Sequence, residues 1–532
     1  MKRKSIVAAA FAVALAPGGF GAASAQAPSK ITMAVPAELT SLDPQFHNVS
    51  TNKQFNAAIF DTLVVQSELG EIEPGLAESW ELIDDTTWEF KLRPDVQFHN
   101  GSEFTSDDVV FSYERIPTIE NSPGSFMSYI ASVDRVEAVD PMTVRIITKN
   151  PDPLLPVYAS SIMMLDRETH EGKLSADFSS AEVIVGTGPY QFVSYQPQQG
   201  AELKRSDTYW GEQPEFEEVS YRIIADDAAR TAALLSGGVD FADQVPASNV
   251  SRIESDENFK VVRSPSLRSV YVLLDRSGNA KFALDNDGNP LPENPFDDLR
   301  VRQALSLAID RNAIVERVME GAAVASGQFM PEGASGYVED LAVPEANAEE
   351  AMRLLAEAGF PDGFRLTLHG PNDQYPNDSV IVQAIGQMWE RVGVKTQIVV
   401  EPFASFVGKA SRQEFSAFLA SWGTSIGDAS SPLRMVLTTY DEGEGTGSAN
   451  RGRYSNPEVD ALAAEAIVTM DPEKRDSLYQ DVTRMAMQDV GFIPLMINVN
   501  IAAMKSDIEH VARIDGHVRP QDMSRTVGSA PQ

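Results

Sequence analysis

The 532-residue sequence contains no cysteine. This absence excludes thiol nucleophiles, iron–sulfur clusters and zinc sites built from cysteine. Histidine is also scarce: the chain has six histidines, and they are scattered along it. No two of them stand four positions apart beside a carboxylate, the spacing of a catalytic zinc helix. We therefore expect no metal site and no cofactor.

Basic residues are few as well. The chain has 43 Lys and Arg against 77 Asp and Glu, a formal charge of −34. Nucleic acids and anionic membrane surfaces would repel such a chain. After the leader described next, no segment reaches 18 uninterrupted apolar residues, so none is expected to span a bilayer. The expected partners are therefore small molecules and proteins.

The first 25 residues have the order of a secretory signal peptide. Residues 2–4 (Lys-Arg-Lys) are basic, an apolar stretch follows to Leu15, and residues 23–25 are Ala-Ser-Ala. The apolar stretch is shorter than the ~20 residues of a membrane-spanning helix. We expect cleavage after Ala25 and a periplasmic mature chain. Because no cysteine follows the cleavage site, we expect no lipid anchor.

The periodicity of apolar residues predicts strands and a few helices first, then longer helices that alternate with strands after Phe296. Glu78–Leu92 alternates on both sides of an Asp-Asp turn, which indicates a hairpin, and Thr105 or Ser106 is placed to cap a helix through Ile116. The alternation in the second half predicts an α/β lobe with a mixed sheet. The remaining helices are expected at 53–65, 226–235, 299–309, 312–319, 348–358, 378–392, 457–470 and 473–489. The remaining strands are expected at 30–36, 143–148, 190–195, 219–224, 259–262, 365–369, 395–401, 415–422 and 492–504.

One motif favours an enzyme. Residues 423–427 read Gly-Thr-Ser-Ile-Gly, the G-x-S-x-G pattern of a serine hydrolase, and they follow an expected strand. His510 and His517 lie downstream, as a catalytic triad requires. Against this interpretation, residues 428–432 separate the motif from the next expected helix, and no regular βαβ run precedes it. A secreted serine hydrolase that uses Ser425 is therefore kept as the alternative function.

Eight segments together resemble one family. The sequence resembles the extracytoplasmic solute-binding protein family 5, the oligopeptide- and dipeptide-type receptors of ABC importers, over essentially the whole mature chain. The segments are SLDPQ (41–45), PGLAESWE (74–81), WEFKLRPDVQFHNG (88–101), FTSDDVVFSYERI (104–116), GTGPYQF (186–192), DLRVRQALSLAIDR (298–311), LLAEAGFPDGF (354–364) and RGRYSNPEVDAL (451–462).

The resemblance implies an α/β fold of the type II periplasmic-binding-protein kind, a Venus flytrap with two α/β lobes and an extra domain. It implies a non-catalytic, largely monomeric receptor that closes over a small solute or peptide and delivers it to an ABC importer permease. After the signal peptide (1–25), lobe I is expected from 26–60, 185–265 and 491–532. The extra domain is expected at 61–184 and lobe II at 266–490.

The resemblance also implies which positions contact the ligand. Trp422 is expected to form the pocket floor, because an indole offers a flat apolar platform. Asp428 either accepts a hydrogen bond from the ligand or caps the segment 430–437, and the ligand contact is favoured. The positions implied are Asn48, Ser50, Tyr129, Tyr271, Asn372, Gln374, Tyr375, Trp422, Ser425 and Asp428.

Two departures from the family pattern concern the charged groups that hold a short peptide. The loop 370–376 has no arginine to bind a terminal carboxylate, and the third place after Trp422 is Ser425 instead of an aspartate. Arg451 or Arg453 is expected to compensate. The ligand is left open among dipeptides, oligopeptides, modified peptides, glycosides and opines. Nickel chelates are disfavoured by the scattered histidines.

Overall fold

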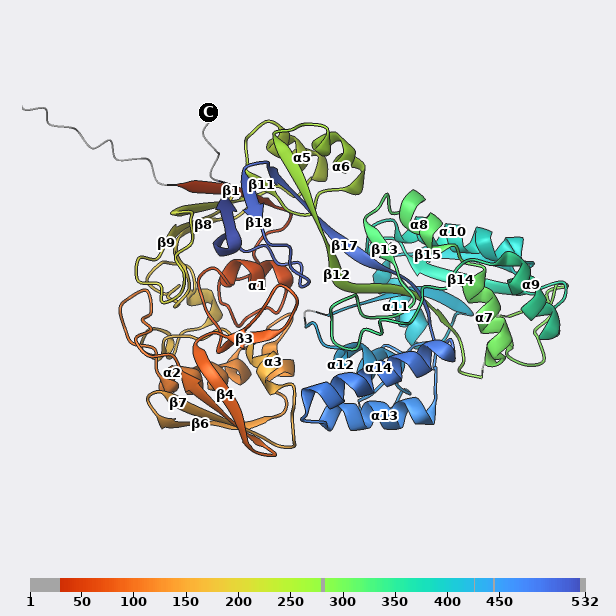
Figure 1. Cartoon of the computed structure of the whole chain (residues 1–532), viewed down its shortest axis with the longest axis horizontal. Coiled ribbons are helices and arrows are strands. Elements are labelled where there is room, and N and C mark those ends of the chain that lie inside the picture. Colours follow the sequence, from red (N-terminus) through yellow and green to blue (C-terminus); the bar gives the residue numbers. More distant parts are fainter. Residues whose placement is uncertain (1–28, 279–282, 425, 444, 527–532) are drawn as a thin grey trace, which may run out of the picture.

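The computed structural model describes residues 29–278, 283–424, 426–443 and 445–526. Its main feature is one mixed sheet of eleven strands in the order β15-β14-β16-β12-β17-β11-β1-β10-β9-β8, with β13 beside β17. The two central strands, β12 (Phe259–Leu274) and β17 (Ile493–Lys505), run from one half of the molecule into the other (Figure 1). They therefore join two groups of strands in a single sheet.

The first half of the sheet is built from the N-terminal elements at 30–56 and from the elements at 190–254. Strand β1 is parallel to both of its neighbours, β10 and β11. The core here packs Phe55 and Phe60 against Tyr190, Phe241 and their apolar neighbours. The elements are β1 (Lys30–Val35), α1 (Ser50–Asn56), β8 (Tyr190–Gln196), β9 (Gly200–Arg205), β10 (Glu218–Ile223), α5 (Asp227–Leu235), β11 (Phe241–Ala242) and α6 (Ala247–Glu254).

In the second half, helices cover both faces of the sheet. Side chains of a strand alternate between faces, so Val270 and Val272 of β12 join a core with α7, α9 and α10. Tyr271 and Leu273 join another core with α11, α13 and α14. The elements are α7 (Leu299–Leu307), α8 (Arg311–Arg317), β13 (Ala323–Ala325), α9 (Ala348–Glu357), β14 (Arg365–Pro371), α10 (Asp378–Arg391), β15 (Lys395–Glu401), α11 (Phe403–Ser411), β16 (Ala417–Gly423), α12 (Ser430–Pro432), α13 (Pro457–Val468) and α14 (Pro472–Gln488).

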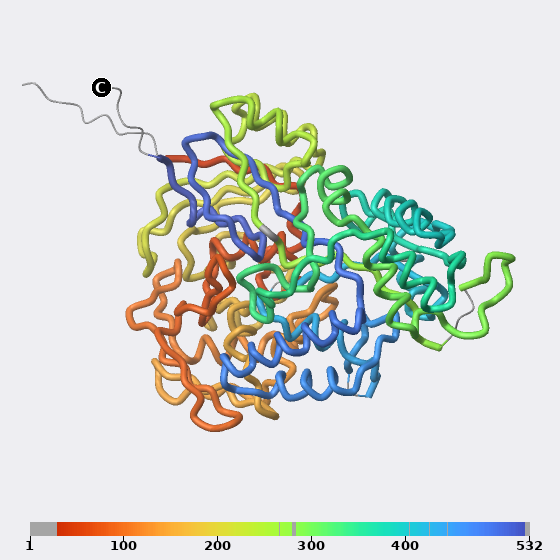
Figure 2. The backbone as a smooth tube through the Cα atoms, turned by 45° about the vertical axis from the view of Figure 1, so that its right-hand side comes forward, coloured from red at the N-terminus to blue at the C-terminus, as the bar shows by residue number. Residues whose placement is uncertain are grey.

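A third part, within 61–184, has an antiparallel sheet of its own in the order β4-β5-β7-β6 and a separate core around Phe90, Phe98 and Val144. Figures 1 and 2 both show this part, in orange, beside α13 and α14. Its elements are β2 (Val64–Gln66), β3 (Ile72–Pro74), β4 (Ala77–Asp84), β5 (Thr87–Leu92), α2 (Ser106–Arg115), β6 (Val133–Asp140), β7 (Thr143–Thr148), α3 (Leu155–Ala159) and α4 (Arg167–His170). Near the C-terminus, β18 (Ile508–His510) pairs with β19 (Met523–Arg525).

Several sequence predictions are confirmed. The hairpin is β4–β5, in which Trp80 pairs with Phe90 and Leu82 with Trp88. Helix α2 begins after Thr105, whose hydroxyl and backbone form a capping box with Asp108. The sheet of the second half is mixed, because β14 is parallel to β15 and β16 while β16 is antiparallel to β12. No described helix has the length and apolarity needed to cross a membrane.

Other predictions were wrong. Helix α1 ends at Asn56 instead of continuing to residue 65. After the helix, the backbone at Ile59 packs closely against Gly186 and Gly188. A Cβ atom on these glycines would lie 2.0 and 2.7 Å from the carbonyl oxygen of Ile59. The short strand expected at 259–262 is the start of β12, which continues to Leu274 because β17 pairs with it along its length. Helix α11 was not predicted. The lobe boundaries at 60, 184, 265 and 490 stay a prediction.

The segment SLDPQ (41–45) supplies the acid of a buried ion pair. The guanidinium of Arg115 in α2 donates to both carboxylate oxygens of Asp43, at 3.1 and 2.6 Å. Asp43 is fully buried and Arg115 is 6% exposed. Arg115 also donates to the side-chain oxygen of Gln45. The pair therefore fixes the segment that leads into α1 against the part of the chain at 61–184.

Replacing Arg115 by methionine should destabilise the protein strongly. The substitution leaves the carboxylate of Asp43 buried without its cation, which costs about 3–5 kcal/mol. Thermal unfolding followed by circular dichroism should show a clearly lowered melting temperature. The control is Arg135→Met, because Arg135 makes only exposed ion pairs. Equal melting temperatures for the two variants would contradict the proposed role of the buried pair.

Candidate ligand-binding site

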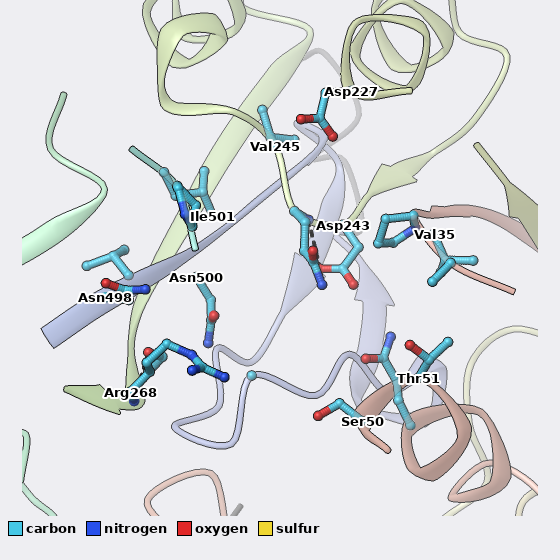
Figure 3. A pocket seen from close by; sticks show the side chains of 18 of the residues that line it. Val35, Ser50, Thr51, Asp227, Asp243, Val245, Arg268, Asn498, Asn500 and Ile501 are labelled. Carbon is cyan, nitrogen blue, oxygen red and sulfur yellow. Dashed lines mark hydrogen bonds between the residues drawn. The ribbon is translucent and has the colours of Figure 1, made fainter. Parts of the chain in front are cut away.

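A cavity of about 910 Å³ lies where β12 and β17 pass between the two halves of the sheet. Its volume is within the range of roughly 300–1,000 Å³ that is usual for small-molecule sites. The walls come from the first turn of α1, the loop between β11 and α6, both central strands and the loops after β14 and β16. Figure 3 shows side chains from α1, the loop between β11 and α6, and both central strands around a common space.

Arg268 reaches the cavity because of an irregularity in β12. Between the pairs Pro265↔Val499 and Ser269↔Ile497, β12 advances four residues while β17 advances two. Such a bulge re-aims side chains next to a binding site. The hydroxyl oxygen of Ser266 accepts a hydrogen bond from the backbone N–H of Arg268, at 3.2 Å, and stabilises the bulge locally. Figure 3 shows the Arg268 side chain extending from the strand into the open space.

The guanidinium of Arg268 is only partly paired. It donates to the hydroxyl of Ser421 at 3.2 Å. It forms no salt bridge with a carboxylate of the described residues. Partial burial lowers the pKa of Arg268, and the Tyr375 phenol acts in the opposite direction. Gly423 lies beneath it, since a Cβ atom there would be 3.1 Å from the guanidinium carbon.

On the other side, Asp243 presents a buried carboxylate. Burial raises the pKa of Asp243 to about 6, although the backbone N–H of Gln244, the charge of Arg230 and the Gln54 side chain oppose the shift. Arg230 is 1% exposed and donates to the carbonyl oxygens of both Asp243 and Gln244, at 2.7 and 2.6 Å. It therefore holds this stretch of the wall in place.

Strand β17 contributes two amide side chains. Asn498 and Asn500 are two residues apart, so they face the same side of the strand and both line the cavity. The Oδ1 atom of Asn498 is buried and has no hydrogen-bond partner within the described structure. The wall also contains three non-glycine residues with positive φ, at 50–59°: Gln244, Glu320 and Asn377. Strained backbone of this kind is frequent in binding sites.

The predicted residues near the N-terminus lie at the cavity. Asn48 and Ser50 both line it. Tyr129 lies behind this wall, and the Asn48 amide nitrogen lies 3.1 Å from its hydroxyl. The ammonium of Lys53, another lining residue, lies 3.5 Å from the same hydroxyl and 5.6 Å from the ring centre. The structure thus brings Asn48 and Ser50 together with Lys53, which the sequence did not indicate.

Of the loop after β14, Tyr375 is the predicted residue closest to the site. Its neighbours Pro376 and Asn377 line the cavity. Tyr375 is 9% exposed, and its hydroxyl has no hydrogen-bond partner among the described residues. Asn372 is exposed and Gln374 donates its backbone N–H to Asp378, and neither lines the cavity. A ligand contact of these two residues stays a prediction.

Tyr271, Arg451 and Arg453 lie away from the cavity wall. Tyr271 is 1% exposed and packs in the core against Phe329 and Phe492. Arg451 donates to the hydroxyl of Ser411, at 3.2 Å. The guanidinium of Arg453 lies over the ring of Tyr440 and donates to the Asn450 carbonyl oxygen. In this conformation neither arginine is placed to compensate for the missing loop arginine, and their ligand contact stays a prediction.

The loop after β16 touches the cavity only at its start. Gly423 and Thr424 line the cavity, whereas Trp422 is half-buried against the core of α11, α13 and α14. Asp428 is 8% exposed, and its carboxylate accepts the backbone N–H of Ser430 at 2.8 Å. This geometry corresponds to the capping alternative, since Asp428 is absent from the lining of the cavity. Ser425 lies outside the described residues.

Some of the residues that were missed had a partial signal in the sequence. The alternation Asn-Val-Asn at 498–500, inside an otherwise apolar strand, indicates a polar strand face. Pro265 within a β-rich run is a typical sign of a bulge, next to which Arg268 lies. Lys53 and Asp243 had no comparable signal. No three histidine, aspartate or glutamate residues in the described ranges are grouped to hold a metal ion.

Comparisons with known proteins agree on one family. The family model for bacterial extracellular solute-binding proteins, family 5 Middle, matches residues 71–444. Heme-binding protein A of Haemophilus influenzae is 28% identical, covering 93% of this chain and 89% of its own length. The dipeptide-binding protein of Escherichia coli is 27% identical, covering 84% and 85%. The unliganded open form of the periplasmic murein tripeptide binding protein MppA has a TM-score of 0.81 at 22% identity, covering 94% and 98%.

The raised pKa of Asp243 predicts a specific pH dependence. The carboxyl group of Asp243 has a pKa near 3.8 in the unfolded chain and about 6 in the folded chain, so the folded state binds the proton more tightly. The stability that this proton contributes to the folded state is therefore fully present below about pH 4. It is lost as the pH rises to about 6, a cost of about 3 kcal/mol. Asp243→Asn removes this cost and should have the higher melting temperature at pH 8, converging with the parent at pH 4.

The matched control is Asp207→Asn, since Asp207 is exposed. It should change the melting temperature little at either pH. A difference between Asp243→Asn and the parent chain that is the same at pH 4 and pH 8 would show that burial does not perturb this carboxyl group.

Proposed function

Because this chain belongs to the bacterial extracellular solute-binding proteins, family 5, we propose that it captures a small polar solute in the described cavity by closing its two halves around it. The loaded receptor then delivers the solute to the permease of an ABC importer. We place the mature protein, after cleavage following Ala25, in the periplasm, where it acts as a monomer.

Family membership confirms the fold class predicted from the resemblance. The chain has the two-lobed, Venus-flytrap α/β architecture of these receptors with an extra domain. Receptors of this kind close by rotation about a few hinge residues. The strands β12 and β17 are the natural hinge, since both pass from one half of the sheet to the other.

The observation that supports the proposal best is the lining of the cavity. Ser50 and Asp243 come from one half of the sheet, Asn377 and Thr424 from the other, and Arg268 from the strand that joins them. A solute that touches both walls binds the closed form more tightly than the open form. Its binding energy therefore shifts the population toward closure.

The chemistry of the wall favours a peptide-like or similarly polar ligand. Its lining includes amide, hydroxyl and charged side chains, and no described histidine or cysteine lines it. The relatives are named for heme and for dipeptides. The polar and charged side chains of the described wall suit a peptide better than the large apolar ring of heme, so we favour the dipeptide-like alternative.

Closure should be visible in solution. A panel of di- and tripeptides, glutathione, opines, oligosaccharides and heme is screened by thermal shift, where saturation at 100 times Kd adds about 2.7 kcal/mol of stability. A compound that raises the melting temperature should also reduce the radius of gyration in small-angle scattering. Ser50→Trp, which places an indole in the cavity, should abolish both responses.

The matched control for this experiment is Ser251→Trp, on the exposed face of α6 and outside the cavity. It should respond as the parent chain does. A compound that raises the melting temperature without changing the radius of gyration would contradict closure. If no compound of the panel raises it, the receptor proposal itself loses its support.

We further propose that the chain has no hydrolase activity. The G-x-S-x-G motif lies at the end of β16, and the segment after it does not enter a helix at once, because α12 begins at Ser430. An elbow serine should sit on a direct strand-to-helix turn. The purified protein should leave generic esters unhydrolysed and remain unlabelled by a fluorophosphonate probe. Labelling that Ser425→Ala removes would reinstate the hydrolase alternative.

A further inference from the structure

We infer that Arg268 binds a carboxylate group of the ligand, so that the cavity selects solutes that carry a free carboxylate. This inference deepens the receptor function proposed above and depends on it. It assigns the charged contact that the loop 370–376, which has no arginine, does not supply.

The position of Arg268 explains why its charge is available. Val270, Val272 and Leu274 form an apolar row on one face of β12, and Arg268 continues this row at the point where the core ends and the cavity begins. On this face it meets the hydroxyl of Ser421. Arg230, Arg302 and Arg311, by contrast, are 1–2% exposed and are saturated by protein oxygens.

Tyr375, next to the lining residues Pro376 and Asn377, carries a second donor. The hydroxyl of Tyr375 is buried without a hydrogen-bond partner in the described structure, on a side chain that is 9% exposed. The positive charge of Arg268 is close enough to oppose the upward shift that burial gives the pKa of Tyr375. A planar guanidinium fork binds a carboxylate through two parallel hydrogen bonds. The phenol adds a third donor to the same acceptor group.

Gly423 makes room for this arrangement. In the register of β12 and β16, Gly423 lies opposite Arg268. A Cβ atom at Gly423 would lie 3.1 Å from both Cζ and Nη2 of Arg268. Its absence leaves the guanidinium free to turn toward the cavity, and the backbone of Gly423 and Thr424 forms the adjoining wall.

The rest of the wall favours a carboxylate over a phosphate. Asp227, Asp243, Glu320 and Asp515 also line the cavity. A phosphate dianion would be repelled by these groups roughly twice as strongly as a singly charged carboxylate at the same distance. Lys53, the other cation of the wall, is 8% exposed and already lies against Tyr129. The single accessible guanidinium thus matches a single negative charge.

The test compares acids with their amides. The parent chain is titrated by calorimetry with free di- and tripeptides, with the same peptides as C-terminal amides, and with inorganic phosphate. Free peptides should bind about 10- to 100-fold more tightly than amides, the usual value of a charge-assisted hydrogen bond. Arg268→Gln should lose this preference, because its affinity for the free acids should fall while its affinity for the amides stays unchanged.

Three further variants separate anchoring from structure. Arg268→Lys should retain part of the preference, because it keeps the charge but not the fork. Tyr375→Phe should lower the affinity for the free acids a few-fold, as expected for loss of one donor. Arg263→Gln is the control, since Arg263 lies on the same strand, is exposed and pairs with Glu254. It should bind as the parent chain does, and circular dichroism confirms the fold of each variant.

The outcomes distinguish this inference from the receptor function. If a neutral solute of the wider panel raises the melting temperature and no carboxylate does, the receptor function stands and the inference is overturned. Equal binding of acids and amides, undiminished binding by Arg268→Gln, or tighter binding of phosphate also overturns it. If no solute binds at all, both fall together.

Discussion

The pairing of β12 with β17 is the interaction on which the rest of the structure depends. The two strands pair from Phe259↔Lys505 to Val272↔Ile493, and the strands of both halves attach on either side of them. Any rotation between the halves must therefore be absorbed within this ladder. The ladder is already interrupted between Pro265 and Ser269, and again between Val270 and Tyr271. Because the cavity lies at the first of these interruptions, a ligand that binds Arg268 contacts the hinge directly.

Features that depend on neighbouring residues could be predicted from the sequence. The hairpin around Trp80 and Trp88 and the capping box of Thr105 each involve residues a few positions apart. Features that depend on distant partners could not. The strand predicted at 259–262 stops short of Pro265, which is a strand breaker by itself, and pairing with β17 carries β12 past it.

The same distinction holds for the site. Asn48 and Ser50 follow a motif with a strong family resemblance, so their segment was identifiable, and they line the cavity. Arg268 was not identifiable, because its role depends on the bulge and on a contact with Ser421, more than 100 positions away. Asp428 illustrates the reverse case. Its place in the loop after β16 favoured a ligand contact, while in this conformation its carboxylate accepts the N–H of Ser430, and the ligand contact stays a prediction.

Charge in the cavity differs from charge on the molecule as a whole. The chain carries a formal charge of −34, yet the negative charge of Asp515 in the wall is neutralised by Arg513 at 3.0 Å and Arg519 at 3.6 Å. These cations and His517 lower the pKa of Asp515 although burial opposes them. Arg268 has no such counter-ion. An acidic ligand therefore meets a locally positive group inside an anionic protein. The hydroxyl of Tyr375 has no partner and the guanidinium of Arg268 is bonded only to Ser421 among the described residues, so both disfavour a ligand that cannot supply an acceptor, since an unmet buried donor costs about 1–3 kcal/mol.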